Sequence, residues 1–180
     1  MKAITLSTEY ISRHPYFKAR VDSYQLPSGK VVDPYFFVEI PVSATAMALT
    51  KEGEVIFVSQ YRHPIGETIL ELPGGFIDEG EDKLDAIKRE LQEETGYTFD
   101  DVQFLGTTAG NPGILNNYTH LFLARGGVKT STQQLDHNEE IEVELKSLEE
   151  ARDILMKSEI KQSMHALCMF YAFQILDGDR

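Results

Sequence analysis

The alternation of apolar and polar positions predicts mainly β-strands in the first part of the chain. Residues 17–26 and 30–40 are rich in aromatic and β-branched side chains, and a Pro-Ser-Gly segment at 27–29 separates them. Two such runs joined by turn residues are typical of a β-hairpin. Further strands are predicted at 43–49, 54–61, 68–72, 102–108, 118–124 and 140–146.

Helical spacing of apolar residues is clearest at 82–95. Leu84, Ile87 and Leu91 fall on one face of a helix in this segment, and Gly96 follows at the position where helices commonly end. Two more helices are predicted at 148–157 and 162–176.

These strands and helices are mixed without strict βαβ alternation, which favours an α+β fold. We expect an α/β/α sandwich with a mixed central sheet and an N-terminal β-hairpin appendage. Residues 1–40 would form that hairpin region, which we expect to pack on a partner subunit in a homodimer. Residues 41–180 would form the main domain.

The net charge limits the kinds of partner that the protein is expected to bind. The chain has 17 Lys and Arg against 29 Asp and Glu, a formal net charge of −12. This excess argues against nucleic acid and anionic membranes, since both attract basic surfaces. The sequence has no apolar run as long as a membrane span or signal peptide, so we expect a cytoplasmic protein. With Cys168 as its one cysteine, the chain can form no internal disulfide and no cysteine-based zinc site.

The acidic residues concentrate in two segments, 78–94 and 136–150. In the predicted helix, Glu90 and Glu94 lie one turn apart and Glu93 lies on the flank of this pair. A glutamate run on a helix is usually a solvated face, and like charges at this spacing repel by about 0.2–0.5 kcal/mol per pair. A bound cation would offset that repulsion, and oxygen ligands beside a phosphate suit Mg²⁺ or Mn²⁺.

The spacing of these residues resembles a known signature. Gly75 is followed after five residues by Glu81, and after seven more by Arg-Glu-Leu-x-Glu-Glu-x-Gly, which starts at Arg89. This pattern is similar to the signature of the Nudix hydrolase family at every fixed polar and glycine position. Tyr97 stands where an aliphatic residue is commoner. The resemblance implies a Nudix fold and hydrolysis of a nucleoside diphosphate linked to another group.

The resemblance also implies roles for the residues of this segment. Glu90 and Glu94 would hold the metal ions, with Glu93 as a further ligand or the catalytic base. The carbonyl of Gly74 would be another ligand. Arg89 would orient the glutamates by ion pairing.

Segments outside the signature are similar to those of ADP-ribose and nucleoside diphosphate sugar pyrophosphatases. These are 60–75, Pro112 and the acidic loop at 136–143. In that subgroup a glutamate of the late acidic loop acts as ligand or base. Glu139 is the first candidate and Glu140 the second, and the base stays open between this loop and Glu93.

The same resemblance implies a set of substrate contacts. Arg62 would contact a phosphate and Glu71 a ribose or base, although Arg62 could instead pair only with an acid. Aromatic residues at 16 and 17 would stack on the base, and amides at 116 and 117 would face the distal sugar. The implied substrate-binding residues are Arg62, Glu71, Tyr16, Phe17, Pro112, Asn116 and Asn117.

Together these features lead us to expect an enzyme that uses Mg²⁺, with Mn²⁺ as a possible substitute. It would split the pyrophosphate bond of ADP-ribose or a nucleoside diphosphate sugar into a nucleoside monophosphate and a sugar phosphate. The alternatives are another Nudix substrate, such as a dinucleoside polyphosphate, NADH or a nucleoside triphosphate, or a non-catalytic module that binds nucleotide sugars.

Overall fold

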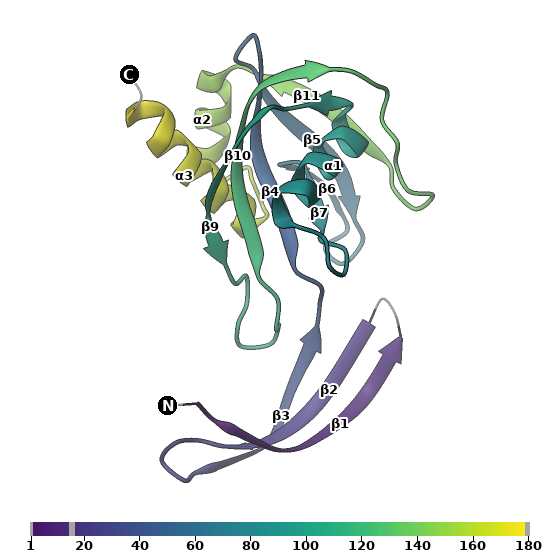
Figure 1. The fold of residues 1–180 in the computed structure, drawn as a ribbon, viewed down its shortest axis with the longest axis vertical. Coiled ribbons are helices and arrows are strands. Elements are labelled where there is room, and N and C mark those ends of the chain that lie inside the picture. The colour runs from purple at the N-terminus through teal and green to yellow at the C-terminus, as the bar shows by residue number, and fades with distance from the viewer. Residues whose placement is uncertain (1, 15–16, 179–180) are drawn as a thin grey trace. The chain divides into compact units, whose positions relative to one another are not determined.

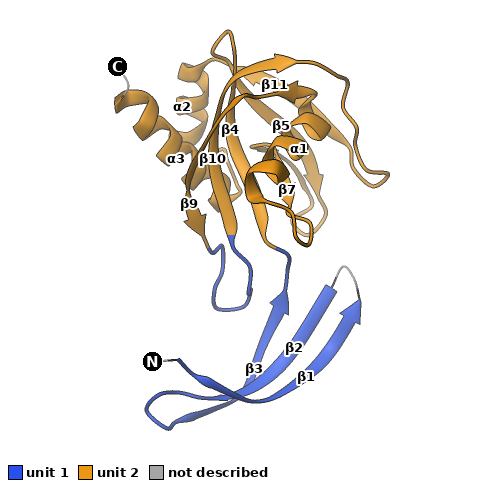
Figure 2. Cartoon of the chain, in the orientation of Figure 1, with its two compact units in different colours: residues 1–41, 109–118 blue, residues 42–108, 119–180 orange. Residues whose placement is uncertain are grey.

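The computed structural model describes residues 2–14 and 17–178, and Figure 1 shows its helices and strands. The chain divides into two compact units (Figure 2). Unit 1 contains residues 1–41 and 109–118, and unit 2 contains residues 42–108 and 119–180. Among the described residues, no helix is both long enough and apolar enough to cross a membrane.

Unit 1 is built on a three-stranded antiparallel sheet of β1 (Ile4–His14), β2 (Phe17–Gln25) and β3 (Val31–Glu39). The predicted hairpin corresponds to β2 and β3. Gly29 adopts a φ of +86° in their connection, a conformation that glycine reaches without strain.

Strand β1 was not predicted, so the appendage is a three-stranded sheet and not a hairpin alone. Its pairing with β2 shifts register twice, between Thr5 and Ser7 and between Tyr10 and Ser12. Such bulges insert an unpaired residue and interrupt the two-residue alternation by which a strand is recognised.

Residues 109–118 also belong to unit 1, although the sequence placed them in the main domain. The amide of Val38 in β3 donates to the carbonyl of Ile114 at 2.8 Å, and Val38 forms a bridge with Leu115. This segment therefore extends the N-terminal unit from a distant part of the chain.

Unit 2 contains one mixed sheet of eight strands, in the order β11-β5-β4-β10-β8, with β6 paired to β5, β7 to β4 and β9 to β10. Only β4 and β10 run parallel among these pairs. The predicted mixed sheet is therefore confirmed. The strands are β4 (Ser43–Thr50), β5 (Val55–Arg62), β6 (Glu67–Glu71), β7 (Gly74–Phe76), β8 (Tyr97–Thr98), β9 (Asp101–Thr108), β10 (Thr119–Lys129) and β11 (Ile141–Lys146).

The sheet of unit 2 is covered on both faces. The helices are α1 (Lys83–Thr95), α2 (Leu148–Met156) and α3 (Ser163–Gly178). Alternate residues of β4 serve opposite cores: Ala46 and Ala48 pack with α1, whereas Met47 packs with α2 and α3. Figure 1 shows α1 on one side of the sheet and the other two helices on the opposite side. This arrangement is the predicted α/β/α sandwich.

Candidate metal and catalytic site

Helix α1 is delimited by local signals that the sequence already contains. The side chain of Asp82 caps its start by accepting a hydrogen bond from the amide of Leu84 at 2.8 Å. Gly96 ends it in the left-handed conformation, with φ of +77°. Ile87 and Leu91 are fully buried against the sheet. The next face of the helix carries the glutamates of the signature.

Glu94 lies at the buried end of this face. Glu94 is 7% exposed, and its Oε2 accepts a hydrogen bond from the amide of Gly74 at 2.8 Å. Burial raises the pKa of Glu94 to about 8, and the negative charges of Glu90 and Glu139 add to the increase. The Gly74 amide and the charge of Arg62 act in the opposite direction.

The glycine-rich segment before α1 lies directly on this carboxylate face. Strand β7 pairs with β4, and a Cβ atom at Gly74 would collide with the backbone of Ala44. A Cβ atom at Gly75 would lie 2.6 Å from the carboxylate carbon of Glu90. Both glycines therefore permit close approaches that a larger residue would block.

Arg89 binds several of the carboxylates. Its guanidinium donates to Glu81 at 2.9 Å, to Glu90 at 2.8 Å and to Glu93 at 3.0 Å. The hydrogen bond from Arg89 is the main reason that the pKa of Glu81 falls to about 2. Burial raises the pKa of Glu90, and the hydrogen bond and positive charge of Arg89 partly offset this increase. Arg89 thus contacts three glutamates, and its part in orienting them for a metal ion stays a prediction.

The acidic loop brings a further carboxylate to this site. Glu139 raises the pKa of both Glu90 and Glu94, so its charge lies close to theirs. Its own Oε2 accepts a hydrogen bond from the amide of Asp136 at 3.1 Å. Glu140 is exposed. Glu139, the first candidate of the loop, therefore lies within electrostatic range of the helix glutamates, and its role in the site stays a prediction.

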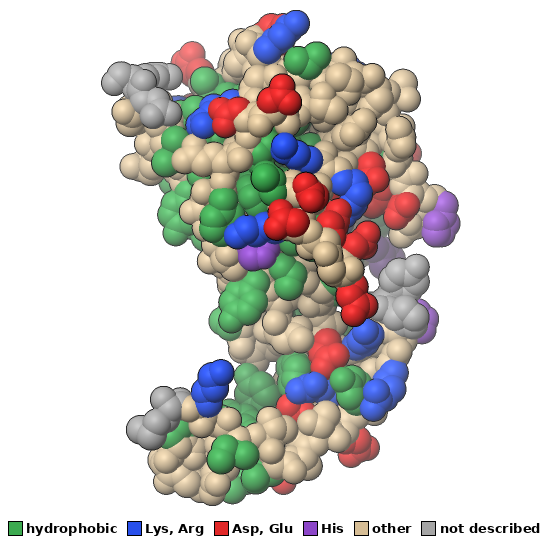
Figure 3. All heavy atoms as spheres, in the orientation of Figure 1, with side chains coloured by type: hydrophobic (Ala, Val, Ile, Leu, Met, Phe, Trp, Pro, Cys, Tyr) green, Lys and Arg blue, Asp and Glu red, His purple; other side chains and the backbone are tan. Residues whose placement is uncertain are grey.

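The donor set fits a hard divalent cation. The carboxylates of α1 and of Glu139 repel one another electrostatically, and Figure 3 shows acidic side chains concentrated where α1 lies. Glu90 is turned to Arg89 and Glu94 to the Gly74 amide. Within the described ranges, no three His, Cys, Asp or Glu side chains are close enough to form a ready metal site.

Arg62 and Glu71 form an ion pair next to this site. Nε and Nη2 of Arg62 lie 2.9 and 2.8 Å from Oε2 of Glu71, whose side chain is 1% exposed. The other oxygen, Oε1, has no hydrogen-bond partner among the described residues. Glu71 therefore lies beneath Arg62 and not at the surface, and its direct contact with substrate stays a prediction.

His165 of α3 is a neighbour that the sequence did not single out as part of the site. Its Nδ1 accepts a hydrogen bond from the amide of Leu72 at 3.2 Å. Burial lowers the pKa of His165 to about 3, and the positive charge of Arg62 lowers it further, so the ring is neutral. His165 thus fixes the chain just before the glycine-rich segment.

The other predicted substrate contacts that the structure describes belong to unit 1. Tyr16 lies outside the described residues. Phe17 begins β2 and is 55% exposed, and Pro112 is exposed. Asn116 accepts a hydrogen bond from the amide of Ile40 at 3.0 Å, and Asn117 donates to the carbonyl of Pro41 at 3.4 Å. In this structure both amides bind the backbone of their own unit.

Comparisons with known proteins agree with the geometry. The profile of the NUDIX domain matches residues 39–167, and that of the nucleoside diphosphate sugar hydrolase N-terminal domain matches residues 4–38. The chain is 32% identical over 168 residues to an ADP-ribose pyrophosphatase of Bacillus subtilis (strain 168) and, likewise, to a methanol dehydrogenase activator of Bacillus methanolicus. Each match covers 93% of this chain and 90% of the relative.

The fold is similar to a solved crystal structure of an ADP compounds hydrolase. The TM-score is 0.86 at 20% sequence identity, over 99% of this chain and 96% of that one. The family profile spans the glycine-rich segment, the glutamate helix and the acidic loop that form the site. The chain belongs to the Nudix hydrolase family and carries the N-terminal domain of nucleoside diphosphate sugar hydrolases.

Proposed function

We propose that this protein hydrolyses the pyrophosphate bond of ADP-ribose or of a nucleoside diphosphate sugar in a Mg²⁺-dependent reaction. The products would be a nucleoside monophosphate and a sugar phosphate. The observation that carries the proposal is the contact of the helix glutamates with the glycine-rich segment, where Glu90 lies against Gly75 and Glu94 binds the amide of Gly74. The name of the Bacillus subtilis relative supports ADP-ribose as the first substrate to test.

Glu90 and Glu94 would hold the cation, with Glu139 and the carbonyl of Gly74 as the further ligands. A divalent cation bound there would neutralise charge on the pyrophosphate and lower the pKa of a bound water. Mn²⁺ is the expected substitute because it prefers the same oxygen ligands. Arg89 holds the carboxylate of Glu90 at 2.8 Å and so limits the directions in which it can turn.

Arg62 is the residue best placed to bind a phosphate. Its side chain is 43% exposed, while its buried edge is fixed by Glu71. A guanidinium held in this way keeps N–H groups free for charge-assisted hydrogen bonds to phosphate oxygens. Glu139 and Glu93 remain the candidate bases for the attacking water, and Glu93 is 41% exposed and paired with Arg89 at 3.0 Å.

The proposal is tested by incubating the protein with Mg²⁺ and a panel of ADP-ribose, nucleotide sugars, dinucleotides and nucleoside triphosphates. We expect monophosphate products from ADP-ribose or a nucleotide sugar. Turnover of triphosphates or dinucleotides alone would instead support another Nudix substrate. Binding of nucleotide sugars without any turnover would identify a non-catalytic module.

We also propose that the protein is a homodimer to which residues 1–40 contribute. The sheet of unit 1 exposes large apolar side chains, among them Ile4, Ile11 and Phe36 at 63%, 61% and 56%. Exposed apolar side chains in this number are typical of an interaction surface. Light scattering should give twice the chain mass of 20.4 kDa, and a monomeric mass would refute the dimer.

The cytoplasmic location stays a prediction.

A further inference from the structure

The segment between β10 and the acidic loop is tied to the end of α1. The amide of Gln134 donates to the carbonyl of Glu93 at 2.8 Å, and the amide of Thr130 donates to the carbonyl of Gly96 at 2.9 Å. The last carbonyls of a helix have no partner within it. Here the segment that leads into the acidic loop supplies partners for them.

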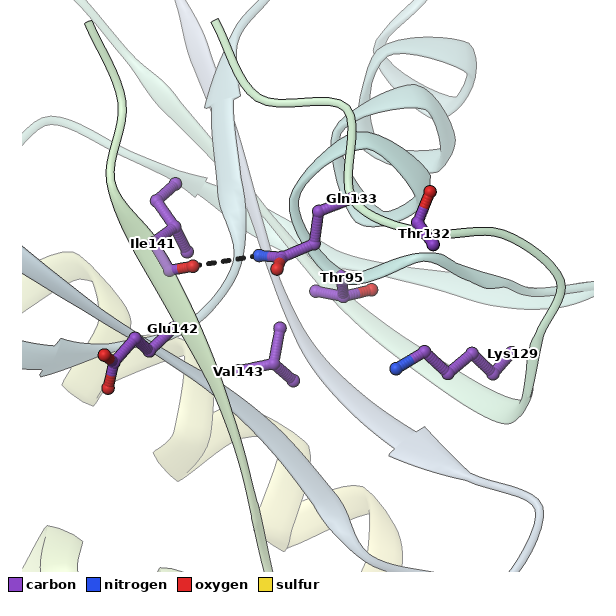
Figure 4. A pocket seen from close by; sticks show the side chains of 7 residues that line it. All are labelled: Thr95, Lys129, Thr132, Gln133, Ile141, Glu142 and Val143. Atoms are coloured by element: carbon purple, nitrogen blue, oxygen red, sulfur yellow. Dashed lines mark hydrogen bonds between the residues drawn. The ribbon is translucent and has the colours of Figure 1, made fainter.

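Gln133 extends this connection with its side chain. Its Nε2 donates to the carbonyl of Glu94 at 2.7 Å and to the carbonyl of Ile141 at 3.0 Å. Figure 4 shows the side chain pointing at Ile141, the first residue of β11. One amide group therefore joins the residue that holds the metal-site carboxylate to the point where the acidic loop rejoins the sheet.

Packing does little to hold Gln133. The side chain borders a cavity of about 500 Å³, lined by Thr95, Lys129, Thr132, Gln133, Ile141, Glu142 and Val143 (Figure 4). Gln133 itself is exposed, whereas Glu94 and Ile141 are 7% and 5% exposed. The two hydrogen bonds, made to carbonyls of buried residues, are thus what fixes its position.

The acidic loop also contains hydrogen bonds between its own residues. The amide of Glu139 donates to the carbonyl of Asp136 at 3.0 Å, and the amide of Asp136 donates to the carboxylate of Glu139 at 3.1 Å. This turn sets the shape of the loop, but it does not connect the loop to α1. The side chain of Gln133 makes that connection at the base of the loop together with the amide of Gln134, and it is the one of the two that also reaches β11.

We propose that Gln133 is a positioning residue that joins the C-terminal turn of α1 to the base of the loop 134–140 and so holds Glu139 beside Glu90 and Glu94. Its effect on turnover rests on the proposed function, while its effect on the loop does not. Partners that orient metal-binding side chains commonly contribute about 10–100-fold to affinity or activity.

The first test is hydrogen–deuterium exchange on the metal-free protein. Gln133→Met keeps the length of the side chain and removes both donors. We expect protection of the amides at 136 and 139 to fall about tenfold or more, with α1 unchanged. Thr132→Val is the matched control, because it lines the same cavity and binds neither carbonyl. Unchanged protection in Gln133→Met, or an equal loss in Thr132→Val, would overturn the proposal.

The second test measures kinetics with ADP-ribose and Mg²⁺. Gln133→Met should lower kcat about tenfold or more while KM changes less than about threefold, because the proposal concerns positioning of the catalytic groups. Glu139→Gln should lower kcat at least as much as Gln133→Met does, and adding Gln133→Met to it should cause little further loss of the remaining activity. Independent, multiplicative losses would show that Gln133 does not act through Glu139.

The two tests separate this inference from the function on which it partly rests. A parent protein that hydrolyses no diphosphate would refute the proposed function, and the exchange experiment would still decide whether Gln133 holds the loop. Lost protection together with an unchanged kcat would overturn the catalytic part of the proposal.

Discussion

The ion pair between Arg62 and Glu71 predicts an asymmetric response of stability to substitution. The carboxylate side chain is 1% exposed, whereas 43% of the arginine side chain is exposed. Arg62→Ala leaves a buried carboxylate without its cation. Glu71→Gln leaves a guanidinium that water already reaches. We therefore expect Arg62→Ala to lower the free energy of unfolding much more than Glu71→Gln.

The magnitudes follow from the two contacts. Removing one partner from a fully buried charged pair costs about 3–5 kcal/mol; because 43% of the Arg62 side chain is exposed, the expected loss for Arg62→Ala lies at the low end, about 3 kcal/mol. Glu71→Gln keeps the shape and one oxygen acceptor, and it weakens two charge-assisted hydrogen bonds of 2.9 and 2.8 Å. Its expected loss is about 1.5 kcal/mol. The double variant buries no charge and should be about 2 kcal/mol more stable than Arg62→Ala.

Urea unfolding of the three variants and the parent measures these differences. The midpoints should shift while the denaturant slope stays the same, because the surface exposed on unfolding hardly changes. Equal losses for the two single variants would refute the reasoning. A double variant less stable than Arg62→Ala would also refute it, since that result would mean that the lone carboxylate is not destabilising.

Two further predictions concern a glutamate of α1 and a glutamate just before it. Gly75→Ala should lower activity about tenfold or more, because its Cβ atom would displace the carboxylate of Glu90. Its stability should change little, since only the flexible end of that side chain has to move. Enzyme assays and thermal unfolding measure the two effects, with Gly106→Ala as the control because the space around Gly106 is open. The pKa of Glu81 is lowered from 4.5 to about 2 by Arg89, so its stabilisation is complete above pH 4.5 and is lost as the pH falls through about 2. Glu81→Gln should therefore flatten acid unfolding in this window, and an unchanged profile would contradict the assignment.

The parts of the fold that could be predicted are those whose signals are local. Helix α1 has an N-cap, an apolar face and a terminal glycine within one segment, and its observed range of Lys83–Thr95 matches the predicted 82–95. Strand β1 could not be recognised, because its two register shifts interrupt the alternation on which a prediction depends. The addition of residues 109–118 to unit 1 depends on backbone pairing with β3, which has no sequence signal.

The candidate site shows the same division. The spacing of Glu90 and Glu94 follows from the helix period, so their shared face could be foreseen. The sequence analysis does not predict that Glu71 is buried. Glu71 nevertheless lies two residues after buried Ile69, on the same face of β6. A charged residue at such a position indicates a buried pair. Gln133 could not be found from the sequence, because its partners are backbone carbonyls and these exist at every position.

The most direct test of the account compares the parent with Glu94→Gln in the hydrolysis of ADP-ribose. Products would be identified by chromatography with and without Mg²⁺. We expect AMP and ribose phosphate in equal amounts from the parent only when Mg²⁺ is present, and a loss of at least about 100-fold in Glu94→Gln, which should fold normally. Absence of turnover of any nucleoside diphosphate, or retention of a tenth or more of the parent activity in Glu94→Gln, would contradict it.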